Sequence, residues 1–229
     1  MEQHSKEWYL ARLGVFTGSE VGKLMVAGRT KGEPFGETAK DYIFDKVSER
    51  LLREEVTENN ELWMEYFNLV SISSKAMDFG TEQEPYARKR YKKITGNRAF
   101  ECGFYQHPDI PNFGTSPDGI VVQDAKVARA VEIKCPLGKT YIKYASQVVD
   151  GATLKKVNSQ YYWQTVSHCM CTGAGVCDFV IYNPFLRPDA RIKIVPIVPP
   201  EEDIELLAER VRLADDYANE LIDQICRKG

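Results

Sequence analysis

The order of helix and strand signals predicts an α/β protein with a central mixed β-sheet and helices on both of its faces. Helical spacing of apolar residues covers most of the first 95 residues, and strand-like runs dominate the middle of the chain. No internal repeat or low-complexity segment interrupts this order. With 229 residues, of which 43% are hydrophobic, the chain is long enough to bury one full core. We therefore expect a single domain over residues 1–229, with an N-terminal helical region of about 1–95 and a C-terminal helix of about 200–227.

Helix signals define the N-terminal region. Gly14 ends a first short helix, and Thr17-Gly18-Ser19-Glu20 matches a capping box, which predicts a second helix from about Ser19 to Val26. A loop rich in glycine, lysine and proline follows at 28–36. The pattern of segment 55–72 fits a helix or a strand. The helices expected in this region cover about 4–13, 19–26, 37–54 and 73–94, the last with a kink or break marked by Gly80 and Pro85.

Strand signals dominate the middle of the chain, where β-branched and aromatic runs are separated by turn residues. They predict a meander of three strands, at about Phe100–Gln106, Gly114–Val122 and Ala128–Lys134. Two helices follow, with a break at Gly151, and two more strands precede the terminal helix. These later elements are expected at about Lys139–Val149, Lys155–Cys171, Cys177–Tyr182 and Ile192–Val198.

The terminal helix carries an apolar stripe whose members are spaced alternately by three and four positions, which places them on one face. The stripe consists of Ile204, Leu207, Val211, Ala214, Ala218, Leu221 and Ile225. Acidic residues 201–203 at its start, and Arg227 and Lys228 at its end, suit the helix dipole. We expect the stripe to pack on the protein's own sheet, and a seam between subunits is the alternative.

Composition limits the function classes without selecting one. The formal net charge is −3, so the whole molecule is not an obvious nucleic-acid binder. A basic run at 88–93 is either a solvated helix face or a contact to a DNA backbone. The six cysteines show no CxxC pair, which is typical of reduced thiols in an intracellular protein. The N-terminus is polar and no apolar run reaches membrane-spanning length, so we expect a cytoplasmic protein without a signal peptide or membrane contact.

Three charged residues in two short motifs point to a chemistry. Asp118 lies in a Ser-Pro-Asp-Gly turn, and Glu132 and Lys134 alternate with Val131 and Ile133 along a strand. Alternation puts Glu132 and Lys134 on the same face, where they can meet Asp118. Two carboxylates suit a hard cation such as Mg²⁺, which takes oxygen ligands and keeps waters and phosphate oxygens. A neighbouring lysine can orient and help deprotonate an attacking water. This spacing matches the PD-(D/E)xK signature of phosphodiesterases.

Each motif also has an ordinary structural interpretation. A Pro-Asp-Gly sequence is often only a hairpin turn, and an alternating Glu/Lys face is often a solvated strand. The order and spacing of the two motifs, with their apolar flanks, favour the site over these alternatives.

The sequence resembles the lambda-exonuclease (YqaJ-like) family of viral alkaline exonucleases, through five motifs in the same order. Arg12-Leu13-Gly14 with Thr17-Gly18-Ser19-Glu20-Val21 is similar to the family's opening motif. The others are Gly80-Thr81-Glu82-Gln83-Glu84, Thr115-Ser116-Pro117-Asp118-Gly119, Val131-Glu132-Ile133-Lys134-Cys135-Pro136, and Gln164 followed by Tyr182-Asn183-Pro184. The resemblance implies a restriction-endonuclease-like (PD-(D/E)xK) core, so that residues 1–229 form one nuclease domain.

The resemblance also implies a role for each site residue. Asp118 bridges two metal ions, Glu132 and the carbonyl of Ile133 hold the first, and Glu84 completes the second. The metal would be Mg²⁺, with Mn²⁺ as a substitute. Lys134 contacts the attacking water and the scissile phosphate.

Three further implications concern positions around these ligands. Gln164 positions the water or a phosphate. Glu82 competes with Glu84, but the Gly-x-x-x-Glu register selects Glu84. A pocket for a 5′-phosphate is implied at Arg12, Ser19 and Ser116. A surface arginine and a plain helix cap are the structural alternatives at Arg12 and Ser19.

The function implied is a Mg²⁺-dependent 5′→3′ exonuclease on the ends of double-stranded DNA. It would yield mononucleotides and 3′ single-stranded tails for phage-type recombination, together with a single-strand annealing protein. A homotrimeric ring around DNA is also implied. The aromatic residues of segment 55–72 are candidates for the ring interface, or equally for the core. Two other functions stay open from the residues: a structure-specific endonuclease, and a catalytically idle DNA-binding or scaffold module.

Overall fold

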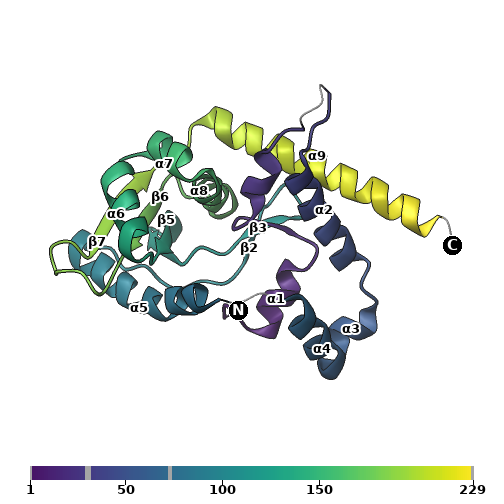
Figure 1. The fold of residues 1–229 in the computed structure, drawn as a ribbon, viewed down its shortest axis with the longest axis horizontal. Coiled ribbons are helices and arrows are strands. Elements are labelled where there is room, and N and C mark those ends of the chain that lie inside the picture. The colour runs from purple at the N-terminus through teal and green to yellow at the C-terminus, as the bar shows by residue number, and fades with distance from the viewer. Residues whose placement is uncertain (1, 29–31, 72–73, 228–229) are drawn as a thin grey trace.

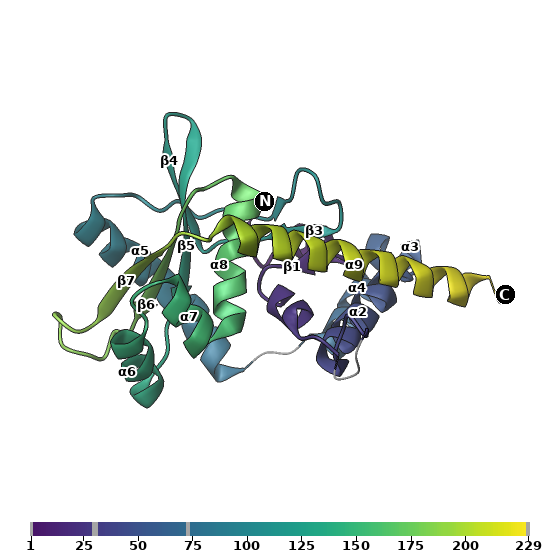
Figure 2. The same ribbon diagram turned by 90° about the horizontal axis from the view of Figure 1, so that it is seen from above.

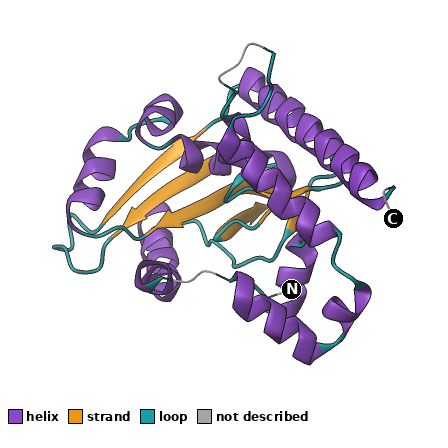
Figure 3. Cartoon of the chain, turned by 45° about the vertical axis from the view of Figure 1, so that its right-hand side comes forward, coloured by secondary structure: helices purple, strands orange, loops and turns teal. Residues whose placement is uncertain are grey.

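The computed structural model describes residues 2–28, 32–71 and 74–227. Three parts of the predictions lie outside these ranges: residues 29–31 of the predicted loop, Ser73 at the predicted start of a helix, and Lys228. The fold class is confirmed. Mixed β-sheets lie in the centre of the molecule with helices on both sides (Figure 1, Figure 3).

The larger sheet has four strands in the order β4-β5-β6-β7. β5 and β6 are parallel, and the two outer pairs are antiparallel. The register places Glu132 beside Phe179 and Lys134 beside Ile181. The strands are β4 (Gly119–Gln123), β5 (Lys126–Lys134), β6 (Cys177–Tyr182) and β7 (Ile192–Ile197).

The smaller sheet corrects the predicted meander. Its order is β1-β3-β2, with β1 (Phe16–Thr17), β2 (Tyr105–Gln106) and β3 (Phe113–Thr115). The strand predicted at 114–122 is therefore two strands in two sheets, β3 and β4, joined by residues 116–118. Pro117 lacks a backbone N–H and cannot continue a hydrogen-bonded ladder, which explains the division. The strand predicted at 100–106 is reduced to β2 and a single bridge between Phe100 and Ile120.

Two helices cover the faces of the larger sheet. α5 (Lys75–Thr95) packs on β5, β6 and β7, and α8 (Ser159–Thr172) packs on β5 and β6 (Figure 2). Val131 and Ile133 share a buried cluster with Ala87 and Tyr91 of α5. Because successive side chains of a strand point to opposite faces, Glu132 and Lys134 lie on the side of α8.

The remaining helices follow the predictions with several corrections. The ambiguous segment 55–72 is helical wherever it forms regular structure, and α2 ends four residues before the predicted limit at Glu54. α5 is continuous through Gly80 and Pro85, so the predicted break is absent. Gly151 begins α7, and the helix predicted at Lys155–Cys171 is divided at Asn158 between α7 and α8. These helices are α1 (Lys6–Arg12), α2 (Glu37–Arg50), α3 (Glu54–Glu58), α4 (Asn60–Val70), α6 (Gly138–Gln147) and α7 (Gly151–Val157).

The apolar stripe of the terminal helix α9 (Glu201–Cys226) packs chiefly on helices, not on the sheet. Its neighbours are α2, α8 and the short 3-10 helix η1 (Val21–Met25). Leu207, Val211, Ala214 and Ala218 are buried in the main core, whereas Ile225 is 56% exposed. The prediction of packing on the sheet was wrong because α8 already covers that face. The buried part of the stripe therefore packs within the chain. Figure 2 shows α9 running past α8 and α2, with its C-terminal end projecting beyond them.

Two expectations from composition can be compared with the structure. All six cysteines are free thiols, as expected. Among the described residues, no helix combines the length and apolar character that a membrane crossing requires.

Candidate active site

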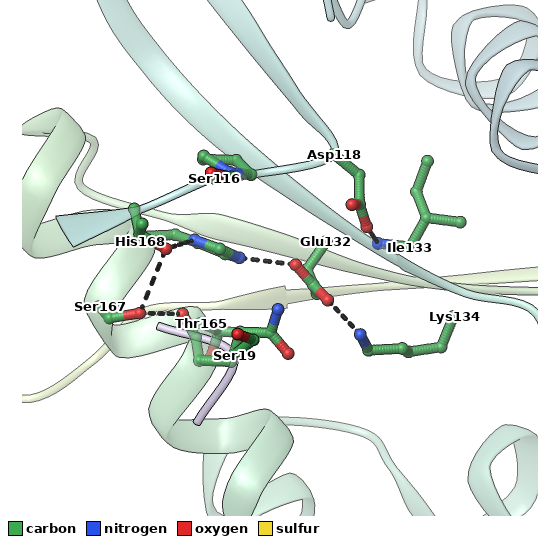
Figure 4. A network of polar contacts seen from close by, with 12 residues as sticks. Ser19, Ser116, Asp118, Glu132, Ile133, Lys134, Thr165, Ser167 and His168 are labelled. Atoms are coloured by element: carbon green, nitrogen blue, oxygen red, sulfur yellow. Dashed lines mark hydrogen bonds and ion pairs between the residues drawn. The ribbon is translucent and has the colours of Figure 1, made fainter. Parts of the chain in front are cut away.

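The end of β5 carries the predicted carboxylate and lysine side by side. Glu132 is completely buried, and its Oε1 lies 2.5 Å from Nζ of Lys134 (Figure 4). Burial by itself raises the pKa of Glu132, but the charge of Lys134 and the hydrogen bond with His168 outweigh it, and the pKa is lowered overall. Burial lowers the pKa of Lys134, but the charges of Glu132 and Asp118 outweigh burial and raise this pKa above its usual value. Both side chains are therefore ionised.

A protonated lysine has no lone pair for a proton. In this arrangement, Lys134 acts as a fixed positive charge that can orient a water molecule or stabilise a phosphate. Its Nζ also lies 4.7 Å from the ring centre of Tyr161 on α8, which restricts its position. The protonated state of Lys134 favours a role in orienting water over a role in deprotonating it.

Asp118 lies immediately before β4, next to the end of β5. Its Oδ2 accepts a hydrogen bond of 2.6 Å from the backbone N–H of Ile133. Burial, followed by repulsion from Glu132 and Glu84, raises the pKa of Asp118 well above its usual value. The third predicted acid behaves similarly: burial, with repulsion from Glu132, raises the pKa of Glu84 to about 7 against the attraction of Arg88. The structure therefore brings Asp118, Glu132 and Glu84 into mutual electrostatic contact.

Arg88, from the basic run, belongs to the frame of this site. It donates to the backbone carbonyl of Asp118 at 2.9 Å and lies 3.5 Å from Glu84, one turn earlier on α5. The competitor Glu82 is exposed, as the register predicted, and lines a separate cavity. The basic run is therefore not one uniform surface, since Arg88 is a structural partner of the acidic cluster.

The chemistry of these residues fits a divalent cation, although they do not form a complete coordination shell. Within the described ranges, no group of three or more His, Cys, Asp or Glu side chains is arranged to hold a metal. However, Mg²⁺ needs only one or two protein carboxylates when water and phosphate supply the other oxygens. Oε1 of Glu132 is buried and accepts no well-formed hydrogen bond. That oxygen already faces the ammonium of Lys134, and a cation between the three carboxylates would offset the repulsion that raises the pKa values of Asp118 and Glu84.

His168 is a site residue that the sequence reasoning missed. It is completely buried on α8, and its Nε2 lies 2.6 Å from Oε2 of Glu132 (Figure 4). Its Nδ1 lies 2.6 Å from Oγ1 of Thr115, the last residue of β3. Since the carboxylate can only accept, Nε2 carries the proton and donates to Glu132. The imidazole therefore fixes one oxygen of Glu132 and leaves the other beside Lys134.

A signal for His168 was present in the sequence. Gln164 lies four residues earlier on α8, and residues four apart lie on the same face of a helix. Gln164 is buried, and His168 lies on the same face of α8. The resemblance places Gln164 at the site, and that placement points to His168 as its neighbour one turn later.

The three residues predicted to bind a terminal phosphate are brought together from two distant parts of the chain, since Arg12 and Ser19 are seven positions apart and Ser116 is 104 positions from Arg12. Arg12 Nη1 donates to Oγ of Ser116 at 3.2 Å, and Nη2 lies 3.5 Å from Oγ of Ser19. The guanidinium is stacked 4.1 Å from the ring centre of Trp8, whose Nε1 also donates to Ser116 at 2.9 Å. Arg12 has no carboxylate in ion-pair range among the described residues, and burial lowers its pKa. A half-buried cation whose direct partners are hydroxyl groups and a ring favours an anion.

Ser19 reaches this cluster in a different way from the one predicted. The capping box at 17–20 does not form, and the helix from Ser19 is only the five-residue η1, capped by Glu20 without a side-chain hydrogen bond. Thr17 pairs with Gly114 in the small sheet, and the Gly18 N–H bonds to the Gly114 carbonyl. Pairing with β3 holds this segment extended, so Ser19 contributes its hydroxyl and not a helix terminus.

The comparisons with known proteins agree with this site. Residues 7–175 match the YqaJ-like viral recombinase domain. The chain belongs to the YqaJ-like viral recombinase family. The matched region contains every residue described in this subsection, from Arg12 to His168. No curated protein sequence matches the chain.

Solved structures of exonucleases resemble this YqaJ-like chain. An alkaline exonuclease (LHK-Exo) from Laribacter hongkongensis is 29% identical, with a TM-score of 0.76 over 98% of this chain and 97% of that chain. The structure of LHK-Exo in complex with dAMP gives 30% identity with the same TM-score and coverage. A phage-related exonuclease from Haemophilus somnus 129PT is 15% identical, with a TM-score of 0.67 over 92% of this chain and 96% of that chain, which shows a common fold.

Proposed function

We propose that this protein is a Mg²⁺-dependent exonuclease that degrades one strand of linear double-stranded DNA from its 5′ end and leaves 3′ single-stranded tails for recombination. Family membership and the likeness to LHK-Exo support a DNA exonuclease. The direction and the mononucleotide product are supported by the distance between two sites. Ser116, in the Arg12 cluster, and Asp118, in the acidic cluster, are two residues apart, so their Cα atoms are at most about 7 Å apart.

That separation is close to the length of one nucleotide step along a strand. A 5′-phosphate held by Arg12 and Ser116 would place the next phosphate of the strand at Asp118 and Glu132. Cleavage there releases a single nucleotide, and the molecule bound in the LHK-Exo complex, dAMP, is a mononucleotide. An endonuclease has no need for a terminal anchor so close to its acidic residues, and an idle module has no need for the acidic residues.

The residues would divide the reaction as follows. Asp118 would bridge two ions, Glu132 and the Ile133 carbonyl would complete the first, and Glu84 the second, with Mn²⁺ able to replace Mg²⁺. Such ions, when bound, polarise the scissile phosphate and lower the pKa of an attacking water. Lys134 would orient that water and stabilise charge on the phosphate. Gln164 would hold the water or a phosphate oxygen from α8.

The proposal includes assembly partners that the family resemblance implies. These are a homotrimeric ring around DNA and a single-strand annealing protein. Of the aromatic residues considered for the ring interface, Trp63 is buried, and Tyr66 and Phe67 are half-buried in the wall of a cavity. They are therefore not free surface aromatics of the kind that an interface uses.

The decisive test uses linear duplexes labelled at either end and carrying a 5′-phosphate or a 5′-hydroxyl, with and without Mg²⁺. We expect Mg²⁺-dependent loss of label from the 5′ end as mononucleotides, faster for the phosphorylated duplex. Arg12→Ala should remove the preference for phosphate, because the cation that faces the terminal anion is lost. Arg187→Ala, at an exposed arginine, is the matched control and should keep the preference. Release of label from the 3′ end first, or of internal fragments from circular DNA, would reject the proposal.

His168 provides a second test, as a positioning residue. We expect His168→Ala to lower kcat by about 10–100-fold with little change in KM for DNA, since partners that orient a ligand carboxylate have effects of this size. His168→Gln should recover part of kcat, because the amide can still donate to Glu132. Steady-state kinetics with Tm measured in parallel would check this. A change in KM alone, or equal loss in both variants at equal Tm, would assign His168 only to the core.

A further inference from the structure

One cavity lies beside the Arg12 cluster and contains none of the residues proposed for catalysis. Its volume is about 710 Å³, and it opens between α1, α2, α4 and the beginning of α5. Aromatic side chains and Arg12 form much of its wall: Trp8, Tyr9, Arg12, Trp63, Tyr66 and Phe67. Asp118, Glu132, Lys134 and Glu84 do not line it.

The aromatic lining follows from how two helices are placed. Trp63, Tyr66, Phe67 and Val70 are spaced by three, one and three positions, which puts them on one face of α4. Tyr9 and Arg12 come from α1, and the rings of Tyr9 and Phe67 meet with centres 4.6 Å apart. This face of α4 thus turns toward α1 and the cavity; Trp63 is buried, and the rings of Tyr66 and Phe67 are only partly covered. Apolar pockets with a few polar groups at one side are the usual form of small-ligand sites.

Charge indicates what kind of group can enter. The wall also contains the carboxylates of Glu20, Glu49, Asp78 and Glu82, which repel phosphate. Glu49 is paired with Lys46 at 2.8 Å, whereas Arg12 faces hydroxyl groups and the ring of Trp8. A phosphate is therefore favoured at Arg12, and a flat group without negative charge is favoured in the rest of the cavity. A nucleotide held by its phosphate has this distribution of charge.

We propose that this cavity binds the base of the 5′-terminal nucleotide by stacking against the aromatic face of α4. The proposal rests on the proposed function, because it requires a 5′-phosphate at Arg12 and the next phosphate at Asp118. The sugar of that nucleotide lies between the two phosphates, and its base turns toward α1 and α4. Stacking on aromatic rings accepts any base, since every base has a π-face.

The test measures binding of 5′-phosphorylated duplexes in EDTA, where no cleavage occurs. One duplex has a normal 5′-terminal nucleotide, and the other has an abasic residue there. We expect wild-type protein to bind the abasic end about tenfold more weakly. Phe67→Ala should weaken binding of the normal end by a similar factor and leave binding of the abasic end unchanged, because the two changes remove the same contact. Tyr66→Ala is the second variant, and it should show the same dependence on the terminal base.

Leu69→Ala is the matched control, since Leu69 is on the same helix, is 80% exposed and does not line the cavity. It should bind both ends as the wild type does. If Phe67→Ala and Tyr66→Ala weaken binding of the normal and abasic ends equally, the proposal is overturned. A change in the oligomer mass of these variants, measured by light scattering, would also overturn it. Wild-type protein that digests DNA without preference for a 5′-phosphate would instead overturn the proposed function.

Discussion

Replacing Lys134 with alanine is expected to abolish DNA hydrolysis, with a loss of at least about 10³-fold in kcat, while DNA binding survives. The ammonium group lies against Glu132 and is held in its protonated form, so in the proposed reaction it would supply a fixed charge at the point where phosphate charge develops. Removal of one such contact in a preorganised site has effects of this order. Single-turnover cleavage measures the loss, and fluorescence anisotropy without divalent ions measures binding.

Two variants separate the charge of Lys134 from its packing. Lys134→Met keeps the length of the side chain over Tyr161 but removes the charge, and it should be as inactive as Lys134→Ala. Lys126→Ala changes an exposed lysine of the same strand and should be fully active. Activity of Lys134→Ala within about tenfold of the wild type would exclude Lys134 from the reaction.

Asp118→Asn is expected to be inactive and, without metal, more stable than the wild type at pH 8. Burial and the carboxylates of Glu132 and Glu84 raise the pKa of Asp118. A carboxyl group with a raised pKa in the folded state stabilises the fold only at low pH, and that stability is lost as the pH rises through the folded-state pKa. The neutral amide avoids this penalty and can still accept from the N–H of Ile133. The gain in Tm should therefore be larger at pH 8 than at pH 5.

Metal should reverse the order of stability. Mg²⁺ or Mn²⁺ is expected to raise the Tm of the wild type and to leave Asp118→Asn nearly unchanged, because ligands stabilise the state that binds them. Asp124→Asn, in the exposed turn between β4 and β5, is the control and should follow the wild type in both conditions. Calorimetric titration with Mn²⁺ counts the bound ions. Wild-type stoichiometry in Asp118→Asn would remove Asp118 from the metal site and with it the two-ion interpretation.

Local sequence determined the catalytic strand. Glu132 and Lys134 share a face because strand side chains alternate, and Val131 and Ile133 are buried under α5 for the same reason. The position of Asp118 followed from turn chemistry, since a Pro-Asp-Gly sequence ends one strand and starts another. The periodicity of α9 likewise identified its buried face. These features depend on neighbours in the chain, so the sequence alone is sufficient to predict them.

Other local signals were overridden by contacts between distant segments. The capping box at 17–20 predicted a helix from Ser19, but Thr17 pairs with β3 and residues 18–20 form a turn, so that only the short η1 follows. Here a pairing with a remote strand outweighs the local preference for a helix cap. The strand expected at 114–122 is divided because Pro117 ends one ladder and the chain enters another sheet.

The tertiary structure alone decided how the site is completed. His168 meets Glu132 across 36 positions of sequence, and Arg12 meets Ser116 across 104. Neither pair has a local pattern, because each depends on how α8 packs on β5 and how α1 packs beside β3. The sequence by itself determined the reactive strand, the acidic turn and the buried helix faces, whose spacing is set by the geometry of a single element. The partner that orients Glu132, the hydroxyl groups around Arg12 and the cavity under α4 arise only when separate elements are packed together.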